Sequence, residues 1–260
     1  MSGPQFAIYI PSKGRAETCS TPRLLMEEGI PFTLVVEPQD HDAYCKEFHN
    51  TSISVLSEND RGLAYARSGA KDVSMERGEE WHWQFDDDLQ ALLRRTDNKN
   101  VPARPRGILR EVEDYVTEYD NIGLAGLCHE VYAWAKPRPL RYNGQCSSFV
   151  LVRNNQLRWR DGVIEDTDYS LQVLSSGLCT VQFNRLVYSV PRTGSMTGGL
   201  TPSHLSAKRV ELSKGLQQAW PGAFKIRIDK KGVARIRPSQ VWRKFPQRPG
   251  QMGLFQESRP

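Results

Sequence analysis

The sequence lacks the features that mark membrane, secreted and zinc-binding proteins. It has no uninterrupted apolar run of the roughly 20 residues that a transmembrane helix needs, and it shows no signal-peptide pattern. Its five cysteines are scattered without a CxxC pair, which predicts reduced, mostly buried thiols and argues against a zinc site. We therefore expect a cytoplasmic protein without a membrane partner.

Two phosphate-binding motifs are also missing. The dinucleotide fingerprint GxGxxG is absent, so an NAD or FAD domain is not supported, and there is no P-loop. No internal repeat is present. What remains is a chain of 260 residues with 38% hydrophobic and 25% charged residues, ordinary values for a globular protein with a real core.

Positive charge is concentrated at the C-terminal end. The formal net charge is +5, from 35 basic and 30 acidic residues. Residues 221–260 hold ten basic and two acidic residues (+8), which leaves 25 basic and 28 acidic residues (−3) in residues 1–220. This asymmetry predicts a domain over 1–220 and a basic arm over 221–260 that suits a polyanionic partner.

Strand-like and helix-like segments alternate through the first part of the chain. The expected strands are 6–10, 32–36, 53–56 and 81–85, and the expected helices are 21–28, 41–48 and 62–76. This alternation predicts an α/β fold with a parallel, Rossmann-like sheet. The expected later elements are helices 108–118 and 169–175, the latter opened by residues 165–168, strands 122–127, 148–152 and 180–183, a polar loop 193–203, and strand-like pieces 224–228 and 233–236.

The most informative feature is three consecutive aspartates, Asp86, Asp87 and Asp88, directly after the strand expected at 81–85. Adjacent carboxylates repel one another unless a cation lies among them, and strand ends are where open α/β sheets bind ligands. Such carboxylates suit Mg²⁺ or Mn²⁺. Alternate residues of an extended segment face the same side, so Asp86 and Asp88 can converge on one ion. The alternative is an acidic turn that caps a helix beginning at Leu89, and spacing alone does not decide between the two.

The order of the motifs resembles a known fold family. A Rossmann-like half ends in Asp-x-Asp, an acidic helix start follows about eighty residues later, and a polar loop comes next. This order is similar to the GT-A fold of nucleotide-sugar glycosyltransferases, over about residues 5–205. More narrowly, the segments IYIPSKGR (8–15) and FTLVVEP (32–38) resemble the phage TET-associated glycosyltransferases.

The resemblance implies a fold, an activity and partners. The fold would be α/β of the GT-A type, a Rossmann-like mixed sheet flanked by helices, with a basic C-terminal extension. The activity would be metal-dependent, inverting transfer of a sugar from a nucleotide donor such as a UDP-sugar, with Mn²⁺ or Mg²⁺. The acceptor would be 5-hydroxymethylcytosine in phage DNA, inside the host cell cytoplasm.

The resemblance also implies which residues bind the nucleotide. The segment after the first strand would line the base and ribose, and RGLAYAR (61–67) would reach back to the nucleotide. Either arginine of that segment can equally be a solvated helix charge. The implied nucleotide-binding residues are Pro11, Ser12, Arg15, Glu37, Arg61, Arg67, Asp86 and Asp87.

Metal and base are assigned in the same way. Asp86 and Asp88 match the outer positions of DxD and would hold the metal, with His204 as a further ligand by position only. The metal would neutralise charge on the departing nucleotide. Asp166 matches the Glu-Asp motif of inverting enzymes and would take the proton from the acceptor hydroxyl. Helix capping accounts for Asp166 without catalysis, Asp168 is the expected cap, and Glu165 remains open as a partner or as the base.

Several weaker candidates and other functions stay open. Residues 144–148 are candidates for the sugar pocket, His129 for a substrate contact or a structural role, and loop 193–203 for a lid or plain surface. The basic, aromatic arm suits DNA. The alternatives are a GT-A enzyme acting on a glycan or protein, a nucleotidyltransferase, and a non-enzymatic nucleic-acid-binding module.

Overall fold

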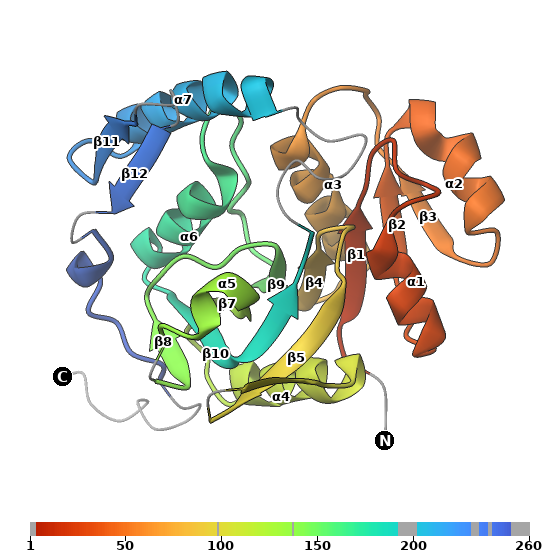
Figure 1. Ribbon diagram of the computed structural model, residues 1–260, viewed down its shortest axis with the longest axis horizontal. Helices are drawn as coiled ribbons and strands as arrows, with labels where there is room; N and C mark the ends of the chain where they lie inside the picture. Colours follow the sequence, from red (N-terminus) through yellow and green to blue (C-terminus); the bar gives the residue numbers. More distant parts are fainter. Residues whose placement is uncertain are drawn as a thin grey trace.

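A ten-stranded mixed sheet organises the molecule (Figure 1). The computed structural model describes residues 4–97, 99–136, 138–191, 202–229, 234–238 and 241–250. Within them the strand order is β3-β2-β1-β4-β9-β7-β10-β5-β6, with β8 paired to β10, and β11 and β12 form a separate two-stranded sheet. No helix in these ranges is both long and apolar enough to cross a membrane.

The elements follow one another along the chain as strands with intervening helices. The strands are β1 (Ala7–Pro11), β2 (Thr33–Val36), β3 (Ser52–Val55), β4 (Trp81–Phe85), β5 (Ala91–Thr96), β6 (Lys99–Pro102), β7 (Ile122–His129), β8 (Leu140–Tyr142), β9 (Phe149–Arg153), β10 (Cys179–Ser189), β11 (Phe224–Ile228) and β12 (Ala234–Pro238). The helices are α1 (Ser20–Glu27), α2 (His41–Glu47), α3 (Leu63–Glu76), α4 (Pro105–Thr117), α5 (Glu130–Ala133), α6 (Glu165–Ser175) and α7 (Pro202–Ala219), with 3₁₀ turns η1 (Pro38–Asp40) and η2 (Val241–Lys244).

The first half of the chain forms the expected Rossmann-like unit. β1 pairs in parallel with β2 and β4, and β2 pairs in parallel with β3. β9 then runs antiparallel to both β4 and β7, so the complete sheet is mixed. The α/β fold class is confirmed. Because β1 and β4 are parallel neighbours, the loops after their carboxyl ends meet at one edge of the sheet.

Alternating side chains sort the helices onto the two faces of this sheet. Ile8 and Ile10 of β1 lie in the large core with helices α1, α2 and α4. Tyr9, between them, faces the opposite side and packs with Ala70 of α3. Tyr169 of α6 packs on that same side, against Val150 and Val152 of β9. The site edge is thus supported by a helix layer on each face.

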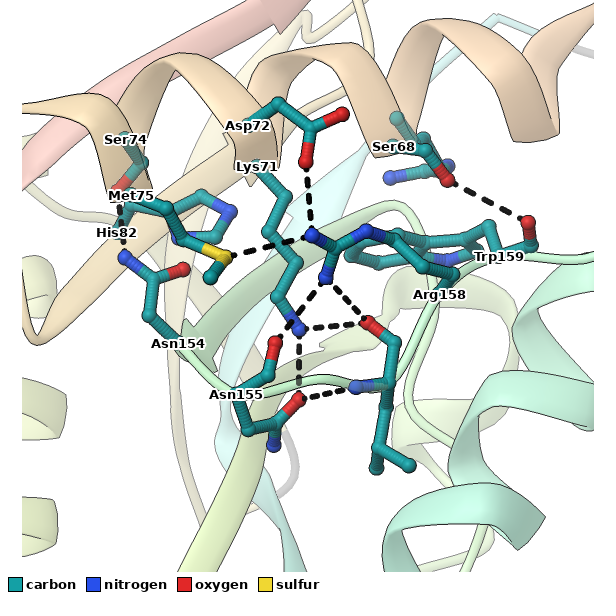
Figure 2. A network of polar contacts seen from close by, with 12 residues as sticks. Ser68, Lys71, Asp72, Ser74, Met75, His82, Asn154, Asn155, Arg158 and Trp159 are labelled. Carbon is teal, nitrogen blue, oxygen red and sulfur yellow. Dashed lines mark hydrogen bonds and ion pairs between the residues drawn. The ribbon is translucent and has the colours of Figure 1, made fainter.

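A buried lysine fastens α3 to the segment after β9 (Figure 2). The Lys71 ammonium donates to Asn155 Oδ1 (2.7 Å) and to the Leu157 carbonyl (2.9 Å). It also donates to the Tyr169 hydroxyl (2.8 Å). Arg158 pairs with Asp72 of the same helix (2.9 Å). These contacts satisfy three donors of a side chain that is fully buried.

Two expectations about elements are wrong or incomplete. No helix begins at Leu89; the chain turns and forms β5, because residues 91–94 pair antiparallel with β10. Helix α7 has no counterpart among the expected elements and includes the last two residues of the expected polar loop. The rest of that loop, residues 193–201, lies outside the described residues.

Part of the basic C-terminal region packs on the preceding chain. Phe224 and Val241 are buried in one cluster with Val163, Leu171 and Leu216. The region therefore contributes apolar surface to the fold in addition to its charge.

All five thiols are free, and four of them are buried. Burial raises the pKa of Cys19 and Cys146 to about 12 and that of Cys179 to about 11, and it also raises the pKa of Cys128. Cys45 on α2 is the half-buried exception.

Candidate active site

The turn after β4 is held by the start of α1. The Ser20 and Thr21 amides donate to the Asp87 carbonyl (3.0 and 3.2 Å). The Thr21 hydroxyl donates to the Asp86 carbonyl (2.6 Å) and accepts from the Leu89 amide (2.8 Å). The free amides at the helix start are satisfied by the turn, so the three aspartates have a fixed backbone.

Asp87 is tied to the loop after β1. It accepts hydrogen bonds from the Ser12 hydroxyl and from Arg15 Nη1, the latter at 2.8 Å. Burial raises the pKa of Asp87, although the bonds from Ser12 and Arg15 act in the other direction. Arg15 therefore has a structural partner that its sequence context did not reveal. The Tyr44 hydroxyl also contacts Ser12 Oγ (2.5 Å) and accepts from the Arg15 amide (3.1 Å).

Asp86 and Asp88 are the two outer aspartates and have different surroundings. Asp86 pairs with Arg67 (2.7 Å), whereas Asp88 forms no ion pair within the described residues. Burial, together with the charges of Asp86 and Asp87, raises the pKa of Asp88 to about 6. A crowded carboxylate of this kind favours a cation beside it.

This donor set fits a hard divalent cation. Mg²⁺ is commonly bound through one or two protein carboxylates plus substrate phosphates, and Asp86 with Asp88 supply two. No group of three or more His, Cys, Asp or Glu side chains is placed to hold a metal within the described ranges. The third proposed ligand, His204, has its backbone in α7, but its side chain lies outside what the structure describes.

A cavity of about 310 Å³ opens at the joined ends of β1 and β4. Glu37, at the end of β2, is buried in its wall and pairs with Lys13 (2.8 Å). Burial acts to raise the pKa of Glu37, but Lys13 and two further donors outweigh it, so the pKa lies below its usual value. The predicted residues that line this cavity are Pro11, Ser12, Arg15, Glu37, Asp86, Asp87 and Asp88.

Asp166 lies close to Asp86 through a shared arginine. Arg67, which is 1% exposed, contacts Asp86 at 2.7 Å and Asp166 at 3.8 Å with the same Nη2 atom. Burial raises the pKa of Asp166 well above its ordinary value; Arg67 opposes this, while Glu165 and Asp86 add to it. The Asp166 carboxylate therefore has a raised proton affinity, which is a property that a general base requires.

A second cavity, of about 390 Å³, lies on the Asp166 side. Gln145, Ser147 and Ser148 line it together with Glu165 and Asp166. Ser148 has a left-handed backbone (φ 63°), a conformation that costs free energy for a non-glycine residue, and its carbonyl accepts from the Asp86 amide (3.0 Å). Ser148 thus links the wall of the second cavity to the turn that carries Asp86, and the part of residues 144–148 in a sugar pocket stays a prediction.

Asp168 is not the helix cap that the sequence suggested. α6 begins after Ile164, which has no side-chain cap, and Asp168 is fully buried within the helix. It accepts from Nε and Nη2 of Arg160, from Gln172 (2.7 Å) and from the indole of Trp220 (2.7 Å). Asp168 therefore links α6 to the end of α7.

Of three further predicted residues, two line neither cavity and one lines the second. Arg61 is half exposed, pairs with Glu58 (2.7 Å) and does not line the first cavity. Arg67 is buried behind both cavities and lines neither. His129 lines the second cavity but also caps α5 through its Nδ1 (3.1 Å to the Val131 amide), and burial lowers its pKa.

Three further residues of the site were not among those predicted. Lys13, Tyr44 and Tyr188 all contact the residues that were predicted or line the same cavities. Lys13 lies within the IYIPSKGR segment, and its positive charge next to predicted nucleotide-binding residues was a signal that could have identified it. Tyr44 and Tyr188 come from elements far away in sequence, and no local pattern marks them.

The chain has matches among solved structures at low sequence identity. No curated protein matches the chain. A structure described as a nucleotide-diphospho-sugar transferase from Desulfovibrio desulfuricans is 12% identical, with a TM-score of 0.43, and covers 83% of this chain and 98% of its own. A structure of GalNAc-T7 with UDP, GalNAc and Mn²⁺ is 6% identical, with a TM-score of 0.48, and covers 72% of this chain and 44% of its own.

The match to a family model covers most of the chain. The mixed sheet flanked by helices is the GT-A-type architecture that the resemblance implied. The model of the TET-associated glycosyltransferase family matches residues 6–199, a range that includes both cavities' aspartates. The chain therefore belongs to the TET-associated glycosyltransferase family.

Proposed function

We propose that this glycosyltransferase moves a sugar from a nucleotide donor such as a UDP-sugar to the hydroxymethyl group of modified cytosine in DNA. The observation that carries the proposal is the contact of Arg67 with Asp86 and Asp166, at 2.7 and 3.8 Å. The Arg67 guanidinium lies between Asp86, at the candidate diphosphate site, and Asp166, the candidate base. Each carboxylate lines a different cavity, as two substrates require.

The first cavity suits the nucleotide donor. It lies outside the carboxyl ends of parallel strands, where α/β sheets bind nucleotides. Ser12, Arg15 and Glu37 supply hydroxyl, guanidinium and carboxylate groups around a partly apolar pocket. Asp86 and Asp88 would hold Mn²⁺ or Mg²⁺ beside the diphosphate. The bound cation would neutralise the charge that develops on the leaving nucleotide.

The second cavity suits the acceptor. Asp166 would accept the proton of the acceptor hydroxyl while that oxygen forms a bond to the anomeric carbon. The bond from that carbon to the diphosphate oxygen breaks, and its electron pair leaves with the nucleotide. Attack from the side opposite the leaving group would invert the anomeric configuration. A positioned base of this kind accounts for roughly 10²–10⁴-fold in rate.

DNA is the acceptor that the charge distribution supports best. The C-terminal 40 residues carry a net charge of +8, and the rest of the chain carries −3. The hydroxymethyl group on C5 of cytosine projects into the major groove, where an enzyme can approach it. A polyanionic acceptor therefore matches both the chemistry and the charge.

The test is mass spectrometry of duplex DNA that contains 5-hydroxymethylcytosine, incubated with a panel of UDP-sugars and Mn²⁺. We expect the mass of one sugar to be added per modified base. Unmodified duplex is the control acceptor, and Asp166→Asn is the control enzyme, which should lose transfer but retain nucleotide-sugar binding.

Two results would contradict the proposal in different ways. Transfer to a glycan or protein, with none to the modified duplex, would remove DNA as the acceptor. Full transfer by the Asp166→Asn variant would remove Asp166 as the base.

A further inference from the structure

A third cavity, of about 450 Å³, is lined by four cations and by no acidic residue. We call it the basic groove, defined by Lys136, Arg138, Arg141 and Arg248. Three of the four come from the stretch between α5 and the end of β8, within the part of the chain whose net charge is negative. The fourth, Arg248, comes from the C-terminal region. The groove therefore combines a local cluster of basic residues with one cation from the C-terminal region.

The four cations lack carboxylate partners within the described residues. By contrast, Arg94, Arg110 and Arg153 each pair with an acidic side chain elsewhere on the surface. Burial lowers the pKa of Lys136, and the nearby Arg141 lowers it further. Like charges held together without counter-charges favour an anionic ligand.

The groove is built into the fold. Arg141 Nη2 donates to the Gln145 carbonyl (2.7 Å), and its guanidinium lies directly over Gly144. A Cβ atom at Gly144 would approach that guanidinium to 2.8 Å, so glycine leaves the room that Arg141 occupies. The buried Asn184 amide donates to the Arg138 carbonyl (2.9 Å) and fixes the loop that carries the charges.

The groove is connected to the Asp166 cavity. Gln145, whose carbonyl binds Arg141, lines that cavity and accepts through Oε1 from Thr167 (3.1 Å), the neighbour of Asp166. Helix α5 directly precedes the segment that carries Lys136 and Arg138, and Tyr132 in this helix (63% exposed) and Trp134 at its C-terminal cap (75% exposed) are both exposed. Exposed aromatic rings beside cations are the combination that binds nucleic acids by stacking and by phosphate contacts.

We propose that the basic groove binds the phosphodiester backbone of the acceptor DNA and aligns the strand for entry of a base into the Asp166 cavity. The inference rests on the proposed function for the identity of the DNA as acceptor. Phosphate contacts from such a groove fix position and register without reading sequence. The groove therefore serves as a general DNA-binding surface, and the modified base is recognised in the cavity.

The test compares two charge-matched double variants of the full chain. Lys136→Gln with Arg138→Gln removes two groove cations whose side chains make no hydrogen bond within the described residues. Arg23→Gln with Lys46→Gln removes two charges on α1 and α2, on the other side of the molecule (Figure 1). Fluorescence anisotropy of labelled duplex DNA is measured over a range of salt concentrations, and thermal unfolding checks that both variants are folded.

The groove variant should bind duplex DNA about tenfold more weakly. The negative slope of log K against log salt should become shallower by about 1.8, which is about 0.9 per lost phosphate contact. The control variant should keep the wild-type slope. An equal slope and affinity in the two variants would overturn the inference. So would displacement of the DNA by millimolar inorganic phosphate, because the groove would then be a small-anion site.

The outcome is separable from the proposed function. If the groove variant loses DNA affinity but the wild-type protein transfers no sugar to modified duplex, the groove stands and the proposed acceptor falls. If the wild-type protein transfers sugar to the duplex and the groove variant binds it unchanged, the proposed function stands and the groove falls.

Discussion

Arg67 shows how one side chain shapes the chemistry of two cavities. A buried guanidinium is stable only when it is paired, and here the pairing is divided between Asp86 and Asp166. Its Nε and Nη1 atoms are buried and have no partner within the described residues. The charge of Arg67 therefore acts mainly on these two carboxylates, and it restrains the pKa of Asp166 from rising further.

The pH profile of the reaction should report the raised pKa of Asp166. A general base must be ionised, so kcat/KM should fall as the pH decreases through a pKa well above the usual value of about 3.9. Glu165→Gln removes a neighbouring negative charge, which lowers the pKa of Asp166 and moves the acidic limb to lower pH. Glu118→Gln, an exposed change on α4's C-terminal cap, should leave the limb in place. An unmoved limb in Glu165→Gln would argue against Asp166 as the titrating base.

Binding of a divalent cation can be tested by stability alone. A ligand that binds only the folded state raises the free energy of unfolding, by about 2.7 kcal/mol at a hundred times its Kd. We expect excess Mn²⁺ to raise the Tm of the wild-type protein and to have little effect on Asp88→Asn. Asp42→Asn, an exposed aspartate on α2, should respond like the wild type. Equal Mn²⁺ shifts in Asp88→Asn and wild type would count against Asp88 as a ligand.

The family resemblance was a good guide to the residues that follow β1 and β4. It implied that Ser12, Arg15 and the aspartates surround one nucleotide, and these residues do line one cavity. The parallel pairing of β1 with β4 is the physical reason. Arg61 was predicted on the same grounds, but its side chain is exposed to solvent and pairs with Glu58. Partners such as Tyr44 depend on long-range packing that no local pattern encodes.

At the scale of elements, the attachment of α3 should depend on pH. Burial lowers the pKa of Lys71 to about 7, and Arg158 adds to this effect. In the unfolded chain the pKa of Lys71 is about 10.4. Between pH 7 and this value the unfolded chain holds the proton and the folded chain does not. The free energy of unfolding therefore rises with pH, by up to about 1.4 kcal/mol per pH unit. Urea unfolding at pH 7 and pH 9 should show a smaller rise in Lys71→Met than in wild type. Lys46→Met on α2 should keep the wild-type rise, and parallel behaviour of all three proteins would mean that Lys71 stays charged.

The missed strands β5 and β8 have a common physical cause. Residues 89–96 contain alanine, leucine and arginine, which favour helices locally. Their pairing with β10, where Leu93 lies opposite Val187, overrides that preference. β8 is only three residues long and exists because β10 offers it a free edge. Pairing across the sheet is tertiary information, so only the elements with strong local periodicity were foreseen.

At the scale of the whole molecule, the C-terminal region should contribute to stability as well as to charge. Phe224 is buried against Leu216 and Val241, so Phe224→Ala should lower the free energy of unfolding by about 3 kcal/mol. Lys225→Ala changes the adjacent exposed residue and should cost less than about 0.5 kcal/mol. Urea denaturation measures both. Equal, small effects would indicate an arm that folds apart from the body.

The unequal burial of the five thiols makes α2 selectively addressable. Cys45 is half-buried, whereas the other four are buried and have raised pKa values, so a maleimide dye should label Cys45 first. The preceding residue, Tyr44, contacts Ser12 in the wall of the first cavity. A fluorophore at this position would report nucleotide-sugar entry in real time, in the unmutated protein and without a turnover assay.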